Sequence, residues 1–503
     1  MSSFKSVDAN DLAALQAICP GRVWSGEAIS PDFAHDELAG AHCLPEVLME
    51  PLNTQEVSAV MRYAWEHNLP VTPRGQGTGL VGGAVALQGG ILLNLSRMNR
   101  ILELDEENLT LTVEPGVLIM DIYPYVEAHG LYYPPNPGEK SATIGGNVST
   151  NAGGMSAVKY GVTRDYVRGL EIVLPDGNIL ELGGKVVKNS SGYSLLNLII
   201  GSEGTLAIVT KIILRLLPLP PLTSSLLAPF PDLKTAARAV PHLLRLKATP
   251  RSIEFMERDV ILAAEEYLGK QLPDSSAEAY LLLLFDGATE EEIERAFDAA
   301  AQVCLECGAL DVLLANTEER QESIWSPRGA FLEAIKASTT EMDECDVVVP
   351  RTAIADFIEF VGETATRIGL RMKSFGHAGD GNCHIYLLRD DLSQNEWQQR
   401  RNAAFEQLYA RARQLGGKVS GEHAPDQLPA LAGGPALFDP GQVGDGRFNG
   451  QEAQMQGLRI ALGLGEGVGG DGLLEFGARQ QQHLRLEAAP RFDLRADGSR
   501  QFC

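Results

Sequence analysis

The segment at 73–83, PRGQGTGLVGG, constrains the fold most, because it concentrates glycine at the end of a short strand pattern, PVTPR. Successive glycines expose backbone N–H groups that can cradle a pyrophosphate, although a flexible turn is the simpler interpretation of such a run. Gly77, Gly79 and Gly82 also fit the G-x-G-x-x-G spacing of a Rossmann loop. The following AVALQGGILLNLS does not begin a helix, and no acidic residue lies at a strand end about 20 residues on. The sequence therefore predicts a phosphate-binding loop outside a Rossmann unit.

Two further glycine-rich segments follow. Segment 133–154, YPPNPGEKSATIGGNVSTNAGG, begins with prolines that fix an extended backbone, and its two glycine pairs allow close approach of a flat ligand. Asn147, Thr150 and Asn151 supply hydrogen-bond donors without bulk. A third segment, GSEGTLAIV, occupies 201–209.

The patterns of apolar residues predict an α+β protein. A chain of 503 residues is long enough for two to four domains. Strand patterns and glycine turns dominate up to about residue 215, with a hairpin turn at Asp176-Gly177. Prolines at 218, 220 and 221 indicate a domain boundary, after which helices and strands alternate. We expect helices at 55–68, 233–247, 289–308 and 352–368, and the divisions 1–220, 221–423 and 424–503.

Charge and composition exclude several classes of function. The net charge of −24 argues against binding to nucleic acid or to an anionic membrane through a basic patch. The chain has no apolar stretch of about 18 residues, and its first residues, MSSFKSVDANDLAALQ, lack a signal-peptide core, so we expect a cytoplasmic protein without a transmembrane segment. Seven cysteines in this length do not form a disulfide framework. Cys304 and Cys307 fall in a helical pattern and are interpreted as buried thiols.

Three of the nine histidines fall in two short motifs, FGHAGDGNCHIY at 375–386 and SGEH at 420–423. His377 and His384 flank a tight turn, which predicts a hairpin that brings both imidazoles together. Glu422 and His423 add a carboxylate and a third imidazole. A lone histidine is more often structural, but two imidazoles and a carboxylate with an open position make a catalytic metal site.

Taken in order, the motifs PRGQGTGLVGG, SATIGGNVSTNAGG, KYG and GSEGTLAIVT resemble the FAD-binding domain of the vanillyl-alcohol-oxidase type. The resemblance spans roughly residues 10–423. It is strongest to the branch of glycolate-oxidase catalytic subunits, D-lactate dehydrogenases and D-2-hydroxyglutarate dehydrogenases. It implies a two-part FAD-binding domain followed by an α+β cap domain that binds the substrate.

The resemblance also implies which residues hold the cofactor. Residues 74–79 would bind the pyrophosphate through backbone N–H groups, and Ile208 would lie near the adenine end. The loop has no histidine that could tether the flavin, so the FAD is expected to be non-covalent. The implied cofactor-binding residues are Arg74, Gly75, Gln76, Gly77, Thr78, Gly79, Pro137, Gly138, Ser141, Thr143, Gly146, Thr150, Asn151, Gly153 and Ile208.

The histidine motifs resemble the metal site of these 2-hydroxy-acid dehydrogenases. Carried over, His377, His384 and Glu422 would bind a divalent metal (zinc, iron or manganese), and His423 would be the base that takes the hydroxyl proton. Arg328, in IWSPRGAF, matches a substrate-carboxylate arginine of the family, although a surface ion pair is the alternative. Leu332, one helical turn later, mildly disfavours a second substrate carboxylate.

The implied activity is oxidation of a small 2-hydroxy acid, D-lactate or glycolate, to the 2-oxo acid, with hydride transfer to flavin N5. Because no second redox motif is seen, the electrons would pass to a partner, either an electron-transferring flavoprotein or an iron–sulfur subunit, or to a quinone. A flavin oxidase that reacts with oxygen is one alternative. The other is an FAD-binding electron-transfer or scaffold subunit with impaired catalysis.

The last 80 residues depart from the family. Relatives continue after S-G-E-H with G-I-G, whereas this chain continues HAPDQ and then changes to a composition with fifteen glycines and no Lys, Thr, Tyr or Trp. We interpret 424–503 as a poorly structured tail, and its abrupt start suggests a frameshifted or replaced end that impairs closure of the active site.

Overall fold

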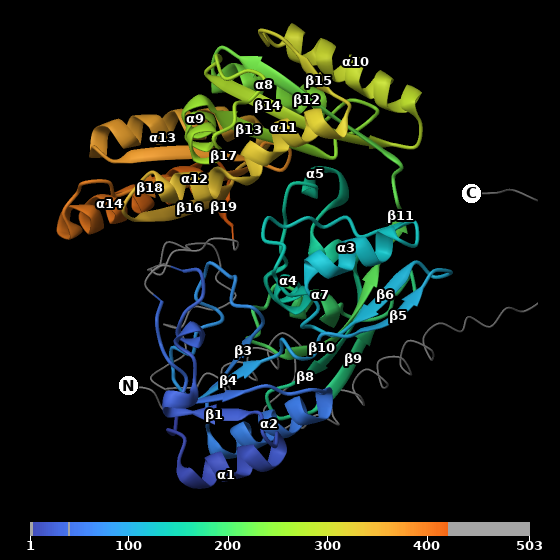
Figure 1. Cartoon of the computed structure of the whole chain (residues 1–503), viewed down its shortest axis with the longest axis vertical. Coiled ribbons are helices and arrows are strands. Elements are labelled where there is room, and N and C mark those ends of the chain that lie inside the picture. The colour runs from blue at the N-terminus through green and yellow to red at the C-terminus, as the bar shows by residue number, and fades with distance from the viewer. Residues whose placement is uncertain (1–3, 39–40, 421–503) are drawn as a thin grey trace, which may run out of the picture.

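The computed structural model describes residues 4–38 and 41–420. Two parts lie one above the other in Figure 1, and they are called here the N-terminal half (residues 4–220) and the C-terminal half (221–420). The N-terminal half contains two sheets and a short ribbon, and the C-terminal half contains one large sheet. The mixture of helices and sheets confirms the expected α+β class.

The first sheet of the N-terminal half has the strand order β1-β2-β4-β3. Strand β4 pairs in parallel with both β2 and β3, a local parallel arrangement that the strand patterns did not predict. The helix between β2 and β3 begins after Asn53, whose side chain accepts from the Glu56 N–H, and ends at Asn68 in the left-handed region. The bounds are β1 (Val23–Ser25), β2 (Val47–Met49), β3 (Val71–Arg74), β4 (Ile91–Asn94), α1 (Ala9–Ile18), α2 (Thr54–His67) and the 3-10 turns η1 (Gly26–Ala28) and η2 (Pro31–Ala34).

The second sheet is antiparallel, in the order β5-β6-β10-β8-β9. Gly177 adopts a φ of 84° in the expected turn between β8 and β9. Short helices cover this sheet and carry the middle glycine-rich segment (Figure 1). The bounds are β5 (Ile101–Asp105), β6 (Thr110–Val113), β8 (Val167–Val173), β9 (Ile179–Gly183), β10 (Ile208–Arg215), the ribbon β7 (Leu131–Tyr132) and β11 (Leu217–Pro218), α3 (Ile119–Glu127), α4 (Ile144–Thr150), α5 (Ala157–Tyr160), α6 (Thr163–Tyr166) and α7 (Leu195–Ile199).

The third sheet has eight antiparallel strands in the order β15-β12-β14-β13-β17-β18-β16-β19. Its strands are β12 (Leu222–Phe230), β13 (Ser252–Glu257), β14 (Ala279–Gly287), β15 (Leu313–Ala315), β16 (Met342–Val348), β17 (Arg371–His377), β18 (Asn382–Leu388) and β19 (Lys418–Val419). The helices are α8 (Leu233–Leu243), α9 (Arg258–Leu268), α10 (Glu290–Glu306), α11 (Glu318–Gly329), α12 (Phe331–Ala337), η3 (Arg351–Ala353), α13 (Ile354–Ile368) and α14 (Gln394–Gln414).

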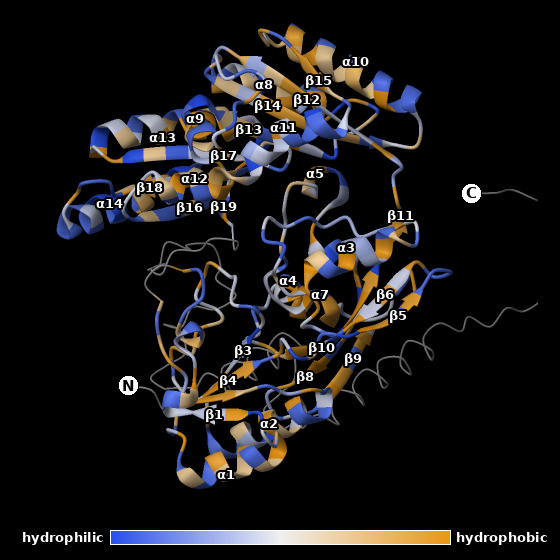
Figure 2. Ribbon diagram, in the orientation of Figure 1, coloured by the Kyte–Doolittle hydropathy of each residue, from blue (hydrophilic) through white to orange (hydrophobic). Residues whose placement is uncertain are grey.

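Helices cover both faces of this large sheet. Helices α8, α10, α13 and α14 pack on one face around a core that includes Phe255 and Leu283. Helices α9, α11 and α12 pack on the other face, around Met256 and Phe375. Strand residues therefore alternate between two apolar layers, and a polar residue in the middle of a central strand, such as Glu254, is buried. The apolar residues of these elements are seen in Figure 2.

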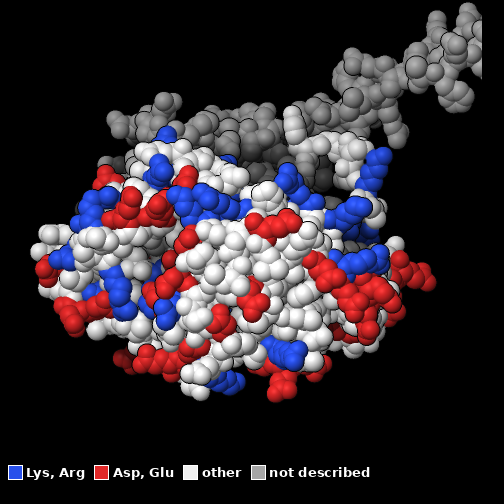
Figure 3. Space-filling view, turned by 90° about the horizontal axis from the view of Figure 1, so that it is seen from above, with Lys and Arg blue, Asp and Glu red and all other residues white. Residues whose placement is uncertain are grey.

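The four helices expected from the sequence are confirmed as α2, α8, α10 and α13. Cys304 and Cys307 are free thiols, and Cys304 is buried on α10 as expected, whereas the expected burial of Cys307 is wrong, because this residue ends the helix and is partly exposed. Across the described residues, no helix combines the length and apolar character needed to cross a bilayer. Acidic and basic side chains are interspersed on the described face seen in Figure 3, which carries no broad basic patch.

Candidate active site

The structure brings the two histidines of the first motif together. They lie on β17 and β18, where Phe375 pairs with His384 and His377 pairs with Asn382. The two imidazole rings are 5.3 Å apart between centroids and nearly perpendicular. In the turn, Gly381 has a φ of 92°, and a Cβ there would overlap the Val349 carbonyl oxygen, so only glycine fits.

Each imidazole is held by a carboxylate that the sequence reasoning missed. Glu254 on β13 is fully buried and accepts from His377 Nδ1 at 2.8 Å. Glu344 on β16 accepts from His384 Nδ1 at 2.9 Å. Each ring is thus oriented through Nδ1, as is found for histidines that bind metals through Nε2.

Arg328 shares the carboxylate of Glu254. From the last turn of α11, its Nε and Nη2 donate to Glu254 Oε2 at 3.1 and 2.6 Å. The guanidinium also lies over the Phe375 ring, 4.6 Å from the centroid. Arg328 is 8% exposed, so the alternative of a surface ion pair is wrong and the pair is a buried one.

The charges of this cluster are strongly coupled. Burial by itself would raise the pKa of Glu254, but His377 and Arg328 outweigh burial and lower that pKa to about 2. Burial would lower the pKa of His377, yet the adjacent Glu254 raises it to about 9. Glu254 is therefore ionised, and its negative charge stabilises the positive charges of His377 and Arg328.

Asn382 and Asp346 complete the polar layer beside His384. Asn382 Nδ2 donates to Asp346 Oδ1 at 2.6 Å, and both residues are buried. Among the described residues, Asn382 Oδ1 has no hydrogen-bond partner. A buried amide oxygen without a partner is costly, so this side of the cluster is suited to a donor supplied by a ligand or water.

Glu422 and His423 lie outside the described residues. Within residues 4–38 and 41–420, no group of three or more His, Cys, Asp or Glu side chains is arranged to hold a metal ion. The described part of the site thus supplies two adjacent imidazoles with supporting carboxylates. Such donors suit zinc, iron or manganese when a further ligand joins them.

The glycine loop is braced from within the protein. Arg74 is buried, and its Nη1 and Nη2 donate to the carbonyl oxygens of His35, Ala84 and Asp32. Gly77 has a φ of 75°, and a Cβ there would overlap the Arg74 guanidinium, whereas Gly79 faces open space. Arg74 therefore supports the loop by its side chain and leaves the backbone of 75–79 to face a ligand.

The three glycine-rich segments meet, as a flat ligand held by several of them requires. A Cβ on Gly75 would overlap Thr143, whose side chain caps α4 by accepting from Gly146 N. The backbone of Gly154, with a φ of 124°, packs against the Asn136 carbonyl group. Segment 201–209 reaches the same helix, because Glu203 N donates to Ser149 O at 2.8 Å.

The remaining expected cofactor residues lie along these segments. Thr150 Oγ1 donates to Gly146 O, and Asn151 accepts from Arg164 N at the end of α4. Ile208 begins β10 with its side chain buried in the apolar core, so only its backbone is available to a ligand. Gln76, Thr78, Pro137, Gly138, Ser141 and Gly153 lie on the loops that join these elements.

The turn between His377 and His384 contacts the N-terminal half. A Cβ on Gly379 would lie 2.7 Å from Cβ of Val158, at α5. Next to this contact, Tyr160 and Lys159 both bond the carboxylate of Asp286 on β14. The turn between the imidazoles and strand β14 are therefore both in direct contact with α5 of the N-terminal half.

Comparison with known proteins identifies two family models along the chain. Residues 45–183 match the FAD binding domain, and residues 219–425 match the C-terminal domain of FAD linked oxidases. The second match ends two residues after His423, where the sequence resemblance also ends.

Curated relatives cover most of the chain. A D-lactate dehydrogenase of Anaerostipes hadrus is 45% identical over 460 residues, which cover 88% of this chain and 97% of that protein. The glycolate oxidase subunit GlcD of Bacillus subtilis (strain 168) is 40% identical over 400 residues, covering 79% and 84% of the two chains.

A solved structure supports the same fold. p-Cresol methylhydroxylase superposes with a TM-score of 0.69 at 18% identity, covering 84% of this chain and 92% of that one.

Proposed function

The chain belongs to the FAD-linked oxidase family, and from this premise we propose that it oxidises a small 2-hydroxy acid, D-lactate or glycolate, to the 2-oxo acid. The chain is an FAD-linked oxidoreductase, and its relatives include enzymes named for both acids. The observation that carries the proposal is the pair of adjacent imidazoles, each oriented through Nδ1 by a carboxylate.

His377 and His384, with Glu422, would bind a divalent metal, which would lower the pKa of a coordinated substrate hydroxyl group. His423 would then accept the hydroxyl proton, since an imidazole with an ordinary pKa of about 6.5 is suited to this near neutrality. Glu254 and Glu344 orient the two ligand imidazoles throughout. The flavin would accept the hydride, which is the redox chemistry that FAD supplies when bound.

Arg328 would attract the substrate carboxylate by its charge. Glu254 occupies its Nε and Nη2, so Nη1 is the nitrogen left to face a substrate oxygen. The aromatic rings of Phe331 and Phe375 lie beside the guanidinium and restrict its motion. The remaining cofactor contacts would come from the meeting glycine-rich segments, with non-covalent FAD.

The electrons would leave to a partner acceptor, an electron-transferring flavoprotein or an iron–sulfur subunit, and we expect this to happen in the cytoplasm. A second candidate function is a flavin-containing electron-transfer or scaffold subunit with impaired catalysis. The composition of residues 424–503, with fifteen glycines and no Lys, Thr, Tyr or Trp, is the reason to keep it.

The decisive experiment uses the purified full chain loaded with FAD and a divalent metal. Dye reduction is followed with D-lactate and glycolate, with L-lactate as the stereochemical comparison and peroxide formation measured in parallel. Dye reduction by either acid supports the dehydrogenase, and peroxide as the main product indicates an oxidase. Flavin binding without reduction by any 2-hydroxy acid would establish the scaffold function instead. Because the FAD is expected to be non-covalent, acid precipitation of the protein should release the flavin into solution.

A further inference from the structure

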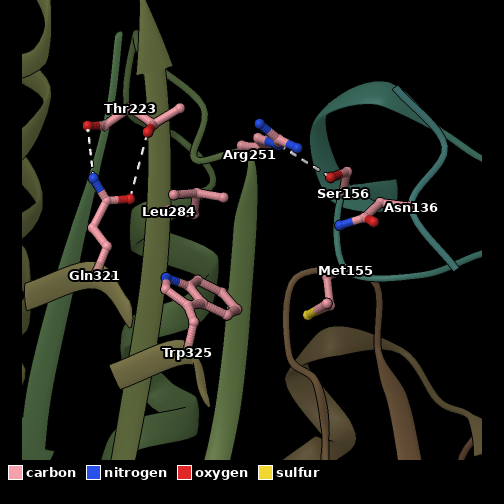
Figure 4. Close-up of a pocket in the computed structure, with 8 residues that line it drawn as sticks. All are labelled: Asn136, Met155, Ser156, Thr223, Arg251, Leu284, Gln321 and Trp325. Atoms are coloured by element: carbon pink, nitrogen blue, oxygen red, sulfur yellow. Dashed lines mark hydrogen bonds between the residues drawn. The ribbon is translucent and has the colours of Figure 1, made fainter. Parts of the chain in front are cut away.

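A cavity of about 200 Å³ lies between the two halves of the protein. Figure 4 shows Asn136, Met155 and Ser156 of the N-terminal half facing Arg251, Leu284 and Trp325 of the C-terminal half. Arg251 is the one charged residue among those that line it. This volume is several times what one water molecule needs, so the cavity can admit a small organic acid.

Helix α11 links the cavity to the candidate active site. Gln321 and Trp325 line the cavity, and Arg328 follows at helical spacing on the same face of the helix. The sheet makes a second connection, because Leu284 pairs with Ser252, whose hydroxyl group donates to Glu254. A ligand in the cavity would therefore lie one helical turn from Arg328.

The guanidinium of Arg251 is held in place but is not neutralised. Its Nε donates to Ser156 Oγ at 3.2 Å, and the group lies over the Tyr132 ring, 5.1 Å from the centroid. Among residues 4–38 and 41–420, no carboxylate forms an ion pair with Arg251, and its two terminal nitrogens have no acceptor. Arginine offers a planar fork of donors that matches a carboxylate, and here that fork faces a cavity.

The surroundings add positive charge. Burial, and next the charge of Arg251, lower the pKa of Lys140 to about 8, so the two cations are close enough to repel one another. The nearest described carboxylate of β14, Asp286, is already bonded by Lys159 and Tyr160. In a chain with a net charge of −24, this concentration of cations around one cavity favours an anion.

We propose that this cavity binds a carboxylate of the substrate and that Arg251 receives it. This inference rests on the proposed oxidation of 2-hydroxy acids and names a second cation for substrate recognition beside Arg328. Arg251 directly precedes β13, the strand that carries Glu254, so the arginine of the cavity and the carboxylate that holds Arg328 belong to one short stretch of chain. The carboxylate that Arg251 receives is either the C1 group of a short acid or the distal group of a longer one.

The test is calorimetric titration of the oxidised, FAD-loaded full chain with pyruvate and with 2-oxoglutarate, which it cannot oxidise further. The variants are Arg251→Met, Arg251→Lys and the matched control Arg245→Met, which removes the same charge at an exposed position. We expect Arg251→Met to weaken binding about 10- to 100-fold, since it removes a charged hydrogen bond. Arg251→Lys should recover part of the loss, and Arg245→Met should bind as wild type.

The two ligands separate the two sources of the carboxylate. Weakened binding of both acids means that Arg251 receives the C1 carboxylate. Weakened binding of 2-oxoglutarate alone means that it receives the distal one. Unchanged binding of both in Arg251→Met, or no binding to the wild type, overturns the proposal. A lower melting temperature with unchanged affinities would show that Arg251 only joins the two halves. Dye reduction by the wild type is measured separately. It tests the proposed oxidation of 2-hydroxy acids, whereas the titrations test the role of Arg251.

Discussion

Glu254 lies 2.8 Å from His377 Nδ1, although 123 residues separate the two in the chain. The same carboxylate binds the Arg328 guanidinium, so one fully buried side chain fixes two expected site residues. We predict that Glu254→Gln lowers the free energy of unfolding by about 3–5 kcal/mol, because it leaves a buried guanidinium without its counterion. Urea denaturation measures this. The double variant Glu254→Gln/Arg328→Met should lose less than the sum of the single variants, and strict additivity would contradict the shared role.

Removal of either imidazole should remove metal and activity together. We expect His377→Ala and His384→Ala to lose bound metal and to lower kcat/KM for the 2-hydroxy acid at least about 100-fold, while flavin content stays near wild type. Elemental analysis and flavin absorbance give the two contents. His129→Ala is the control, because His129 is exposed and bonds only the Tyr125 carbonyl group. Chelator treatment of the wild type should reproduce the loss, and full activity without metal would exclude a metal-assisted reaction.

The glycine loop gives a test of cofactor binding. Gly77→Ala combines a φ of 75° with an overlap on the immobilised Arg74 guanidinium, so we expect FAD affinity to fall at least about tenfold. Flavin fluorescence on binding measures this affinity. Gly21→Ala is matched in backbone conformation, with a φ of 72° and no atom within 4 Å, and should leave FAD affinity unchanged. If both variants lost FAD affinity equally, backbone strain and not the overlap with Arg74 would explain the loss.

The hairpin turn gives a test of stability. Gly381→Ala places a Cβ onto the Val349 carbonyl oxygen at a φ of 92°, and we predict a loss of about 3 kcal/mol or more in unfolding free energy. Gly269→Ala, with a φ of 63° and open space, should cost only about 1 kcal/mol. Thermal and urea unfolding compare them, and a smaller loss at Gly381 than at Gly269 would contradict the packing argument.

Glu257 should make stability depend on pH. Burial raises its pKa from 4.5 to about 7, although Ser374 donates a hydrogen bond to the carboxylate. The unfolded chain therefore loses its proton first as pH rises, and the free energy of unfolding falls between pH 4.5 and 7. Glu257→Gln should flatten this fall and be more stable than wild type at pH 8 by about 1–2 kcal/mol. Urea unfolding at both ends of the window decides this. Glu278→Gln, at an exposed ion pair, is the control.

Local sequence patterns predicted much of the fold. The hairpin between His377 and His384 followed from a tight glycine turn between two strand patterns, and the helices from apolar spacing. The parallel pairing of β4 was not predictable, because it joins segments far apart in the chain. Glu254 and Glu344 were missed for a related reason. Glu254 is a carboxylate inside an apolar strand, SIEFME, which signals a buried charge but not its partner. Glu344 is one of three acidic residues in MDECDVV, and nothing local separates it from the other two.

The remaining sequence expectations stay predictions. The division of the chain near residue 220, and the roles given to the individual cofactor residues, rest on the resemblance and the patterns alone. Glu422 and His423, and the tail at 424–503, lie outside the described residues.

The contact of Gly379 with Val158 limits how the two halves of the protein can separate. A Cβ at Gly379 would lie 2.7 Å from Cβ of Val158, and the two γ carbons of Val158 lie within 3.1 Å of the same point. A β-branched side chain is restricted at χ1 and cannot fold away from such an overlap. Any larger residue at position 379 would therefore push the turn away from α5, so this one glycine sets how tightly the seam between the halves closes.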